Sequence, residues 1–496
     1  MKSKTVWVSG LLAALLLAAV ATAPQASTAG SEIKIRPGLE RALRTAPGSD
    51  AVLHVWIYFK DKGVAEGAST RRALAEVRAG LRARSLQRRA KALPADGLVD
   101  ELDIPVRTDY AANVQALATS VRAVSRWLNA VSVEATPAQV LALAGLDGVG
   151  SLDIVHAFRY ENPSVVLDGE SDEAETADAS EPNPGYKPFY GAAYRQVGMM
   201  GVPELHAAGL TGNGVIVCLL DLGFHKSHEV FQSARIIAEH DFVMKDDDVQ
   251  QDPAVSADYT DYHGTACWSL LGGYKPGTLV GPAYGADFIL GRTEDYRSET
   301  PVEEDYWVAG IEWAESLGAD VVSSSLGYTD WYHFADMDGQ TAVTTKAANR
   351  ATALGVVVVN AAGNERGGSW GHVIAPADGF DVLAIGAVAA NRKISSFSSP
   401  GPTADGRIKP EVCAMGVQNF VARSGLNMGN ASYAMGSGTS YATPLVAGVV
   451  ALLLEAHPDW TVAQVRDALM STADNAAAPN NDYGWGIVNA PAAVRK

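Results

Sequence analysis

One glycine-rich stretch places a serine where nucleophilic chemistry could occur. In Gly436-Ser437-Gly438-Thr439-Ser440, small residues lead up to a hydroxyl, and an apolar run over residues 446–454 follows. A run that is hydrophobic on every side is typical of a buried helix. Ser440 would then stand at the helix N-terminus, where the dipole favours the oxyanion of acyl transfer. Taken alone, the stretch is more typical of a glycine-rich helix cap.

Three further polar residues stand in glycine-marked turns upstream of this serine. Asp221 closes an apolar run over residues 215–220, and Asn364 follows another over residues 356–359. His263 opens a His-Gly-Thr sequence just before a helix-like stretch. Each alone could be a helix cap, a turn or a satisfied histidine. An aspartate, a histidine and a serine in this order are harder to explain separately, and together they indicate nucleophilic catalysis.

The elements that must position these residues alternate between strand and helix. The apolar runs over residues 215–220, 321–325 and 356–359 predict strands that are buried on both faces. Between them, apolar residues with helical spacing predict helices over residues 307–318 and 343–355. This alternation predicts an α/β domain in which helices cover both sides of a parallel sheet, making three layers. Active sites in such sheets form at the carboxyl ends of the strands.

The four motifs together resemble those of the subtilisin-like serine proteases. These are Asp-x-Gly at Asp221, His-Gly-Thr at His263, Ala-Ala-Gly-Asn at Asn364 and Gly-Thr-Ser-x-Ala-x-Pro at Ser440. The order of aspartate, histidine and serine is also that of the family. The resemblance covers residues 190–496 and implies a subtilisin-like catalytic domain with serine endopeptidase activity.

The resemblance also implies a role for each site residue. Ser440 would be the nucleophile, His263 its general base, and Asp221 the group that orients the imidazole. Asn364 and the backbone N–H of Ser440 would receive the oxyanion. An extended substrate backbone would pair with an edge segment. The residues expected to bind substrate are Ser325, Leu326, Gly327 and Gly363.

The sequence departs from the family pattern beside two of these motifs. Leu222 follows Asp221, where the family usually has a hydroxyl residue. A hydroxyl that could help to orient the aspartate is therefore absent. Tyr441 replaces the common methionine after the nucleophile, which we interpret as a packing change. Residues 365–374 should help to shape the primary pocket, but their sequence indicates no particular specificity.

The part of the chain before residue 190 divides into three segments. Residues 1–29 have a charged start, an apolar run and small residues, which predicts a cleaved secretory signal rather than a membrane anchor. Residues 30–165 resemble the family's pro-region, which implies a folding assistant and intramolecular inhibitor. Residues 166–189 are acidic and poor in apolar residues, so they predict a linker. The product would be a secreted, extracellular or periplasmic enzyme that acts on proteins or peptides.

The pro-region is expected to be a small α/β unit. Strands are predicted over residues 52–59, 125–133 and 149–158, and a helix over residues 139–146 behind a Thr136-Pro137 cap. A basic helix is predicted over residues 71–91, and we interpret its many arginines as a solvated face.

Composition limits the partners and cofactors. The net charge of -17 argues against nucleic acid or an anionic membrane as the main partner, and no stretch after the signal is long enough to span a membrane. Cys218, Cys267 and Cys413 show no disulfide framework and no metal-ligand spacing, so we predict buried thiols. The resemblance implies no cofactor for the chemistry. Structural calcium is common in the family, but the acidic loop over residues 239–261 has no fixed ligand spacing and is more typical of a solvated loop.

Three alternatives to an active neutral protease have different sequence signatures. A non-catalytic binding or scaffold protein on the same fold would be favoured by the loss of a triad residue, and Leu222 is the only feature in its support. Acid-acting relatives lack the His-Gly-Thr histidine and the oxyanion-hole asparagine, whereas this chain has His263 and Asn364. A nucleotide-binding loop at residues 436–440 would need a lysine that is not present there.

Overall fold

The computed structural model describes residues 34–46, 48–155, 183–250, 262–295, 303–329, 332–424 and 429–496. The expected signal segment, residues 1–29, and most of the expected acidic linker lie outside the described residues.

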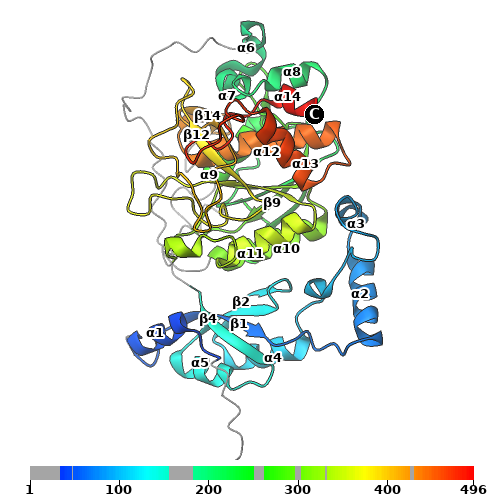
Figure 1. Cartoon of the computed structure of the whole chain (residues 1–496), viewed down its shortest axis with the longest axis vertical. Helices are drawn as coiled ribbons and strands as arrows, with labels where there is room; N and C mark the ends of the chain where they lie inside the picture. Colours follow the sequence, from blue (N-terminus) through cyan, green and yellow to red (C-terminus); the bar gives the residue numbers. More distant parts are fainter. Residues whose placement is uncertain are drawn as a thin grey trace, which may run out of the picture.

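A seven-stranded sheet organises the larger part of the chain, residues 183–496 (Figure 1). Its strand order is β13-β12-β11-β10-β5-β9-β6, and all six pairings between neighbours are parallel. The strands are β5 (Ile216–Asp221), β6 (Arg235–Asp241), β9 (Asp287–Arg292), β10 (Val321–Ser324), β11 (Val357–Ala361), β12 (Leu383–Val388) and β13 (Val412–Met415). The predicted parallel sheet is therefore confirmed.

Helices cover both faces of this sheet, and strand residues alternate between two hydrophobic cores. Along β5, Val217 and Leu219 belong to the core under α9 (Tyr262–Gly272) and α12 (Thr439–Ala456). Cys218 and Leu220 belong to the core under α10 (Glu303–Leu317) and α11 (Val343–Ala353). Two buried faces explain why the strands are continuous apolar runs. The result is the expected three-layer α/β architecture.

Shorter elements complete this part of the chain. The helices are α6 (Lys187–Tyr190), α7 (Tyr194–Gly198), α8 (Val202–Ala207), α13 (Val462–Thr472) and α14 (Ala490–Val494). The strands are β7 (Tyr274–Lys275), β8 (Leu279–Val280), β14 (Asn419–Ala422) and β15 (Tyr433–Gly436), which form two small hairpin sheets. Contrary to the expectation that no stretch after the signal could span a membrane, the described helix α12 is long and apolar enough to do so, but 89% of its 18 residues are buried inside the fold. We therefore interpret α12 as the central core helix.

The N-terminal part is built on a four-stranded antiparallel sheet of order β2-β3-β1-β4 (Figure 1). The strands are β1 (Leu53–Phe59), β2 (Ser120–Ser125), β3 (Ala130–Ala135) and β4 (Val149–Ile154). The helices are α1 (Pro37–Thr45), α2 (Ala68–Gly80), α3 (Ala83–Arg89), α4 (Thr108–Leu117) and α5 (Pro137–Ala144). Thr136 caps α5 with a capping box, as its sequence predicts.

Two predictions for this part are wrong. Residues 125–133 are not one strand, because the chain turns between β2 and β3. Residues 71–91 are not one solvated helix: α2 and α3 are separate helices, and Arg88 and Arg89 are buried at 1% and 0% exposure. Their burial follows from contacts with the larger part of the chain, because α10 lies against both β2 and α3.

Candidate active site

The hydroxyl of Ser440 is placed by the first turn of α12. Ser440 is the second residue of that helix and is 4% exposed. Its Oγ donates to the backbone oxygen of Ser325 at 3.1 Å, and the Oγ of Ser325 donates back to the oxygen of Ser440 at 2.8 Å. The turn after β10 and the start of α12 therefore hold each other in place. The serine stands at a helix N-terminus, where the dipole favours negative charge.

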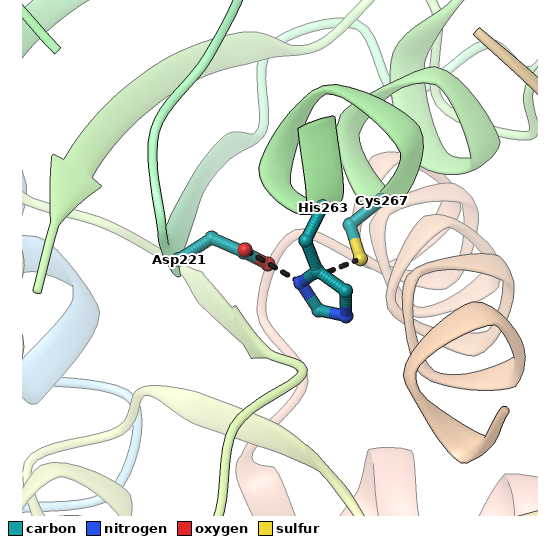
Figure 2. A group of neighbouring side chains, drawn as sticks. All are labelled: Asp221, His263 and Cys267. Carbon is teal, nitrogen blue, oxygen red and sulfur yellow. Dashed lines mark hydrogen bonds and ion pairs between the residues drawn. The ribbon is translucent and has the colours of Figure 1, made fainter. Parts of the chain in front are cut away.

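His263 and Asp221 form a buried hydrogen-bonded pair (Figure 2). Asp221 is the last residue of β5 and His263 the second residue of α9; they are 1% and 4% exposed. The imidazole Nδ1 lies 2.7 Å from Asp221 Oδ1, and the acceptor-only carboxylate assigns the proton to Nδ1. A Cβ on Gly264 would lie 2.2 Å from the oxygen of Gly223, so only glycine lets α9 approach this closely.

The electrostatics of this pair favour a basic imidazole. Burial lowers the pKa of His263, but the charge of the Asp221 carboxylate raises it, and the net pKa lies well above 6.5. The other ring nitrogen, Nε2, is buried and has no hydrogen-bond partner among the described residues. The hydroxyl of Ser440 is bonded to Ser325 rather than to this nitrogen. The unpaired Nε2 is therefore the ring atom that can accept a proton.

The backbone of Leu222 orients the Asp221 carboxylate. The N–H of Leu222 donates to Asp221 Oδ1 at 2.8 Å, so the carboxylate is held although the neighbouring hydroxyl is absent. The Leu222 side chain itself is buried at 4% exposure. Orientation of the aspartate thus comes from the backbone amide and from His263.

Asn364 is oriented by the residue before Ser440. Its Oδ1 accepts from the N–H of Thr439 at 2.9 Å and from the Thr439 hydroxyl at 3.0 Å. The amide NH2 is left as the donor end of the side chain, and Asn364 lines the same cavity as Ser440. A preorganised donor beside a serine hydroxyl is the arrangement that stabilises an oxyanion.

The predicted site residues converge on one cavity of about 90 Å³. Besides Asn364, the predicted residues that line it are His263, Ser325, Leu326, Gly327, Gly363 and Ser440. Asp221 stands behind His263. The cavity lies at the carboxyl ends of β9, β10 and β11, as parallel sheets predict, because Glu294, Ser325 and Ala361 line it.

Ile374 narrows this cavity, which the sequence did not indicate. A Cβ on Gly327 would lie 2.0 Å from Ile374 Cδ1, and one on Gly363 would lie 2.9 Å from Ile374 Cγ2. The isoleucine side chain therefore fills the space between the two glycine-bearing walls. Residues 365–374 were expected to shape the pocket, but only the fold shows which of them enters it.

A pair of buried carboxyl groups was also missed. Glu294 lines the cavity and Glu303 begins α10, and they are 2% and 4% exposed. Burial raises the pKa of Glu294 to about 7 and that of Glu303 to about 11, so the pair retains a proton at neutral pH. The Tyr328 hydroxyl donates to Glu294 at 2.7 Å. Glu294 lies two residues after the end of β9, so the rule that selected Asp221, a polar residue at the carboxyl end of a strand, could have found it.

Cys267 lies closer to the site than its apolar neighbours suggested. Its Sγ is 3.9 Å from His263 Nδ1 (Figure 2). The same sulfur is 3.5 Å from the oxygen of Ser440. Residues four apart share a helix face, so their spacing on α9 could have shown this contact. Asp221, His263 and Cys267 offer possible metal ligands within 4.8 Å, but Nδ1 is committed to Asp221. All three cysteines are buried and free, as predicted.

The described part of the acidic loop does not fit a calcium site. The Lys226 ammonium lies 2.7 Å from Glu239 and 2.8 Å from Asp248, and Asp247 bonds His240 at 2.8 Å. These carboxylates are thus paired with side chains of the chain itself. Glu239 belongs to β6 rather than to a loop. Two further carboxylates of this acidic loop, Asp252 and Asp258, lie outside the described residues.

Comparisons with known proteins agree with this geometry. Residues 212–486 match the Subtilase family, and residues 54–168 match the Peptidase S8 propeptide domain of Bacteroidota. The chain is 35% identical over 295 residues to subtilisin E of Bacillus subtilis (strain 168), covering 59% of this chain and 69% of that protein. It is 34% identical to subtilisin of Bacillus pumilus over 59% of this chain and 95% of that one.

A solved structure extends the fold comparison to both parts of the chain. Fervidolysin from Fervidobacterium pennivorans, a keratinolytic enzyme related to subtilisin, superposes with a TM-score of 0.59 at 19% identity. The match covers 90% of this chain and 61% of fervidolysin. At this identity, the comparison supports the fold alone. From the family matches and the subtilisin relatives, the chain belongs to the subtilase family of serine endopeptidases and has a propeptide domain ahead of its protease domain.

Proposed function

We propose that this serine endopeptidase is secreted and acts through Asp221, His263 and Ser440. Ser440 attacks the peptide carbonyl while His263 Nε2 takes the hydroxyl proton and later donates it to the leaving amine. Asp221 holds the Nδ1 tautomer and stabilises the imidazolium. The observation that carries the proposal is the convergence of the Asp221–His263 pair and the α12 serine at one cavity.

The proton transfer requires one small rearrangement. The Ser440 hydroxyl leaves the oxygen of Ser325 and turns toward the unpaired Nε2 of His263. Catalytic hydrogen bonds are often loose in free enzymes and tighten when substrate binds. The Asn364 amide and the N–H of Ser440 then receive the developing oxyanion. The segment Ser325–Leu326–Gly327 binds the substrate backbone by strand addition, with Gly363 on the opposite wall.

We further propose that the chain is a self-processing precursor. Residues 1–29 are its signal, residues 30–165 its inhibitory pro-region, residues 166–189 the cleaved linker and residues 190–496 the protease. The propeptide match to residues 54–168 supports this division. The contacts of the N-terminal part with α10 support inhibition within the same molecule. The chemistry uses no cofactor.

Variants of the nucleophile and the base test the mechanism. Ser440→Ala and His263→Ala should each lower kcat for a peptide substrate by about 10⁶-fold, the loss known from subtilisin. Ser437→Ala is the matched control, because it removes a neighbouring hydroxyl whose contact lies elsewhere: it accepts from the backbone N–H of Gln418 at 3.0 Å. This control should stay within about twofold of wild type. Substantial hydrolysis by purified Ser440→Ala would rule out Ser440 as the nucleophile.

A further inference from the structure

Two of the most deeply buried cations of the described chain lie far from the catalytic cavity. Arg88 and Arg89, at the end of α3, are 1% and 0% exposed. The short helix belongs to the segment between β1 and α4, and it reaches across to the protease part (Figure 1). A buried guanidinium must be matched by acceptors, because an unpaired buried charge is strongly destabilising.

The acceptors of Arg88 all belong to the carboxyl ends of two neighbouring helices. Its Nη1 donates to the oxygen of Ala319 at 2.6 Å, and its Nε to the oxygen of Leu354 at 3.2 Å. Both terminal nitrogens also lie 3.4 Å from the oxygen of Glu315. The last carbonyls of a helix lack partners within the helix, and the dipole makes this end negative. One planar guanidinium therefore satisfies the ends of both α10 and α11.

Glu315 adds a carboxylate to these backbone acceptors. Its side chain is fully buried and pairs with Arg88, Arg89 and Arg126, all from the N-terminal part. Arg89 bonds it with two nitrogens, at 2.8 and 2.9 Å, while the remaining face of Arg89 bonds Asp103. Arg88 thus enters a socket that the protease part forms from Glu315 and the backbone oxygens of Ala319 and Leu354. Arg89 connects this socket to Asp103 of its own domain.

Two glycines let α3 lie directly on this socket. Gly318 and Gly355 follow α10 and α11 with φ of 94° and 88°, the left-handed conformation that ends many helices. A Cβ on Gly318 would lie 2.7 Å from Arg84, and one on Gly355 would lie 3.2 Å from the oxygen of Arg88. Both termini are therefore flush with the arginine helix. Ser85 closes the edge by donating to the oxygens of Glu315 and Ser316 at 2.8 and 3.0 Å.

The socket and the catalytic cavity lie at opposite edges of the sheet. α10 and α11 lead into the amino ends of β10 and β11, whereas Ser325 and Gly363 follow the carboxyl ends of these strands. A ligand in the socket is thus separated from Ser440 by the length of the strands.

We propose that the carboxyl ends of α10 and α11, together with Glu315, form a binding site for a guanidinium group, which Arg88 occupies in the precursor. The site selects guanidinium over ammonium, because its carbonyl acceptors surround a planar fork rather than a point charge. After the N-terminal part has left, a step that rests on the proposed processing, the site binds the arginine side chain of a peptide like α3.

Chemical rescue in the full chain tests the site without relying on the protein's own proteolytic activity. Ser440→Ala is used as the background, and the readout is the half-life of residues 60–107 under added thermolysin. Arg88→Ala should shorten this half-life about tenfold or more, because Glu315 loses a buried partner. Ethylguanidinium at millimolar concentration should restore the half-life saturably, whereas ethylammonium should not. Arg72→Ala, which removes an 83% exposed arginine on α2, is the matched control and should change nothing.

Three results would overturn the proposal. They are an unchanged half-life for Arg88→Ala, no rescue by ethylguanidinium, or equal rescue by ethylammonium. If Arg88→Ala does not fold, Arg88→Gln retains the Cβ and Cγ methylenes, removes the guanidinium and supports the same comparison. Adding Glu315→Gln to Arg88→Ala should lower the apparent affinity for ethylguanidinium about tenfold or more, since the charge-assisted hydrogen bonds are lost.

Enzyme that has shed the N-terminal part tests the vacated site. Its serine is blocked with a fluorophosphonate, and a labelled peptide with the sequence of residues 82–93 is titrated in. Binding should be saturable and should weaken about tenfold or more when the peptide has Arg88→Lys. Equal affinity of the two peptides would contradict a guanidinium site. Failure to shed the N-terminal part would count against the proposed processing, while the rescue experiment would still decide the site.

Discussion

At the scale of single residues, hydrogen bonds decide which atom can do which chemistry. Asp221 fixes the proton on His263 Nδ1, which leaves Nε2 as the basic atom of the ring. Thr439 holds the oxygen of Asn364 through its N–H and its hydroxyl, so the amide NH2 serves as the donor. The sequence motifs predict these residue types but not their orientation. Leu222 is an example: its side chain cannot donate a hydrogen bond to Asp221, but its backbone N–H does, and the motif does not predict this contact.

The activity should depend on pH through His263. Burial lowers the pKa of this histidine and Asp221 raises it, with a net pKa above 6.5. The base must be neutral to accept a proton, so kcat/KM should rise with pH through this pKa. A pH–rate profile with a chromogenic peptide measures this, once the enzyme is shown to be stable at each pH. An optimum below about pH 5 would contradict a histidine base, whose ordinary pKa is about 6.5.

Asn364→Ala should lower kcat by about 10²–10³-fold and leave KM nearly unchanged. The amide acts on charge that exists only in the transition state, so its removal does not weaken ground-state binding. Steady-state kinetics separates the two constants. A kcat close to wild type, or a loss confined to KM, would remove Asn364 from the oxyanion site.

Ile374 should restrict the residue before the scissile bond to small side chains. Its side chain lies between Gly327 and Gly363 and narrows the cavity that Ser440 also lines. Ile374→Ala should raise the kcat/KM ratio of phenylalanine over alanine substrates by about tenfold or more. Ile237→Ala, on exposed surface of β6, is the control and should leave this ratio unchanged. A wild-type enzyme that already prefers phenylalanine would contradict this reading.

At the scale of elements, prediction succeeded where one local signal decides the structure. Continuous apolar runs gave the buried strands β5, β10 and β11, and the Thr136-Pro137 cap gave the start of α5. It failed at residues 125–133, where the turn has neither glycine nor proline. Asn129, with φ of 50°, supplies the left-handed residue there, and asparagine tolerates this conformation better than most.

The basic segment failed for a different reason. Helix propensity is local, but the burial of Arg89 depends on Glu315, 226 positions away. No window of sequence contains that pair, so a run of arginines gives no sign that two of them are buried. The Glu294–Glu303 pair is close in sequence, but its contact also depends on the fold, because the two carboxyl groups meet only when β9 and α10 are in place.

At the scale of the whole molecule, contacts join the N-terminal part to the protease part, and the proposed processing would have to break them. Composition and resemblance predicted the division, and the family matches support a propeptide followed by a protease. The way the units dock could not be predicted. It depends on α10, which pairs Asp305 with Arg122 at 3.0 Å and accepts from the N–H of Trp127 through Glu312 at 3.3 Å. In the proposed mechanism, such contacts hold the pro-region on the protease until the linker is cut.

The precursor should cut itself between about residues 168 and 190. The segment is acidic and poor in apolar residues, and its attachment to the protease gives it a high effective concentration. N-terminal sequencing of purified wild type should find the mature start there, while Ser440→Ala should keep the pro-region. A mature start before residue 150, or normal processing of Ser440→Ala in a protease-free host, would contradict self-processing.

The most direct test of the central claim is to map the residue that a serine-directed fluorophosphonate modifies. The mature enzyme is labelled, digested and analysed by peptide mass spectrometry. Ser440 should carry the adduct, because its hydroxyl stands at a helix N-terminus and lines the same cavity as His263, whose Nε2 is unpaired. Labelling should disappear in His263→Ala, which keeps the hydroxyl but loses the base. An adduct on another residue, or no adduct in enzyme that hydrolyses peptides, would contradict the proposed mechanism.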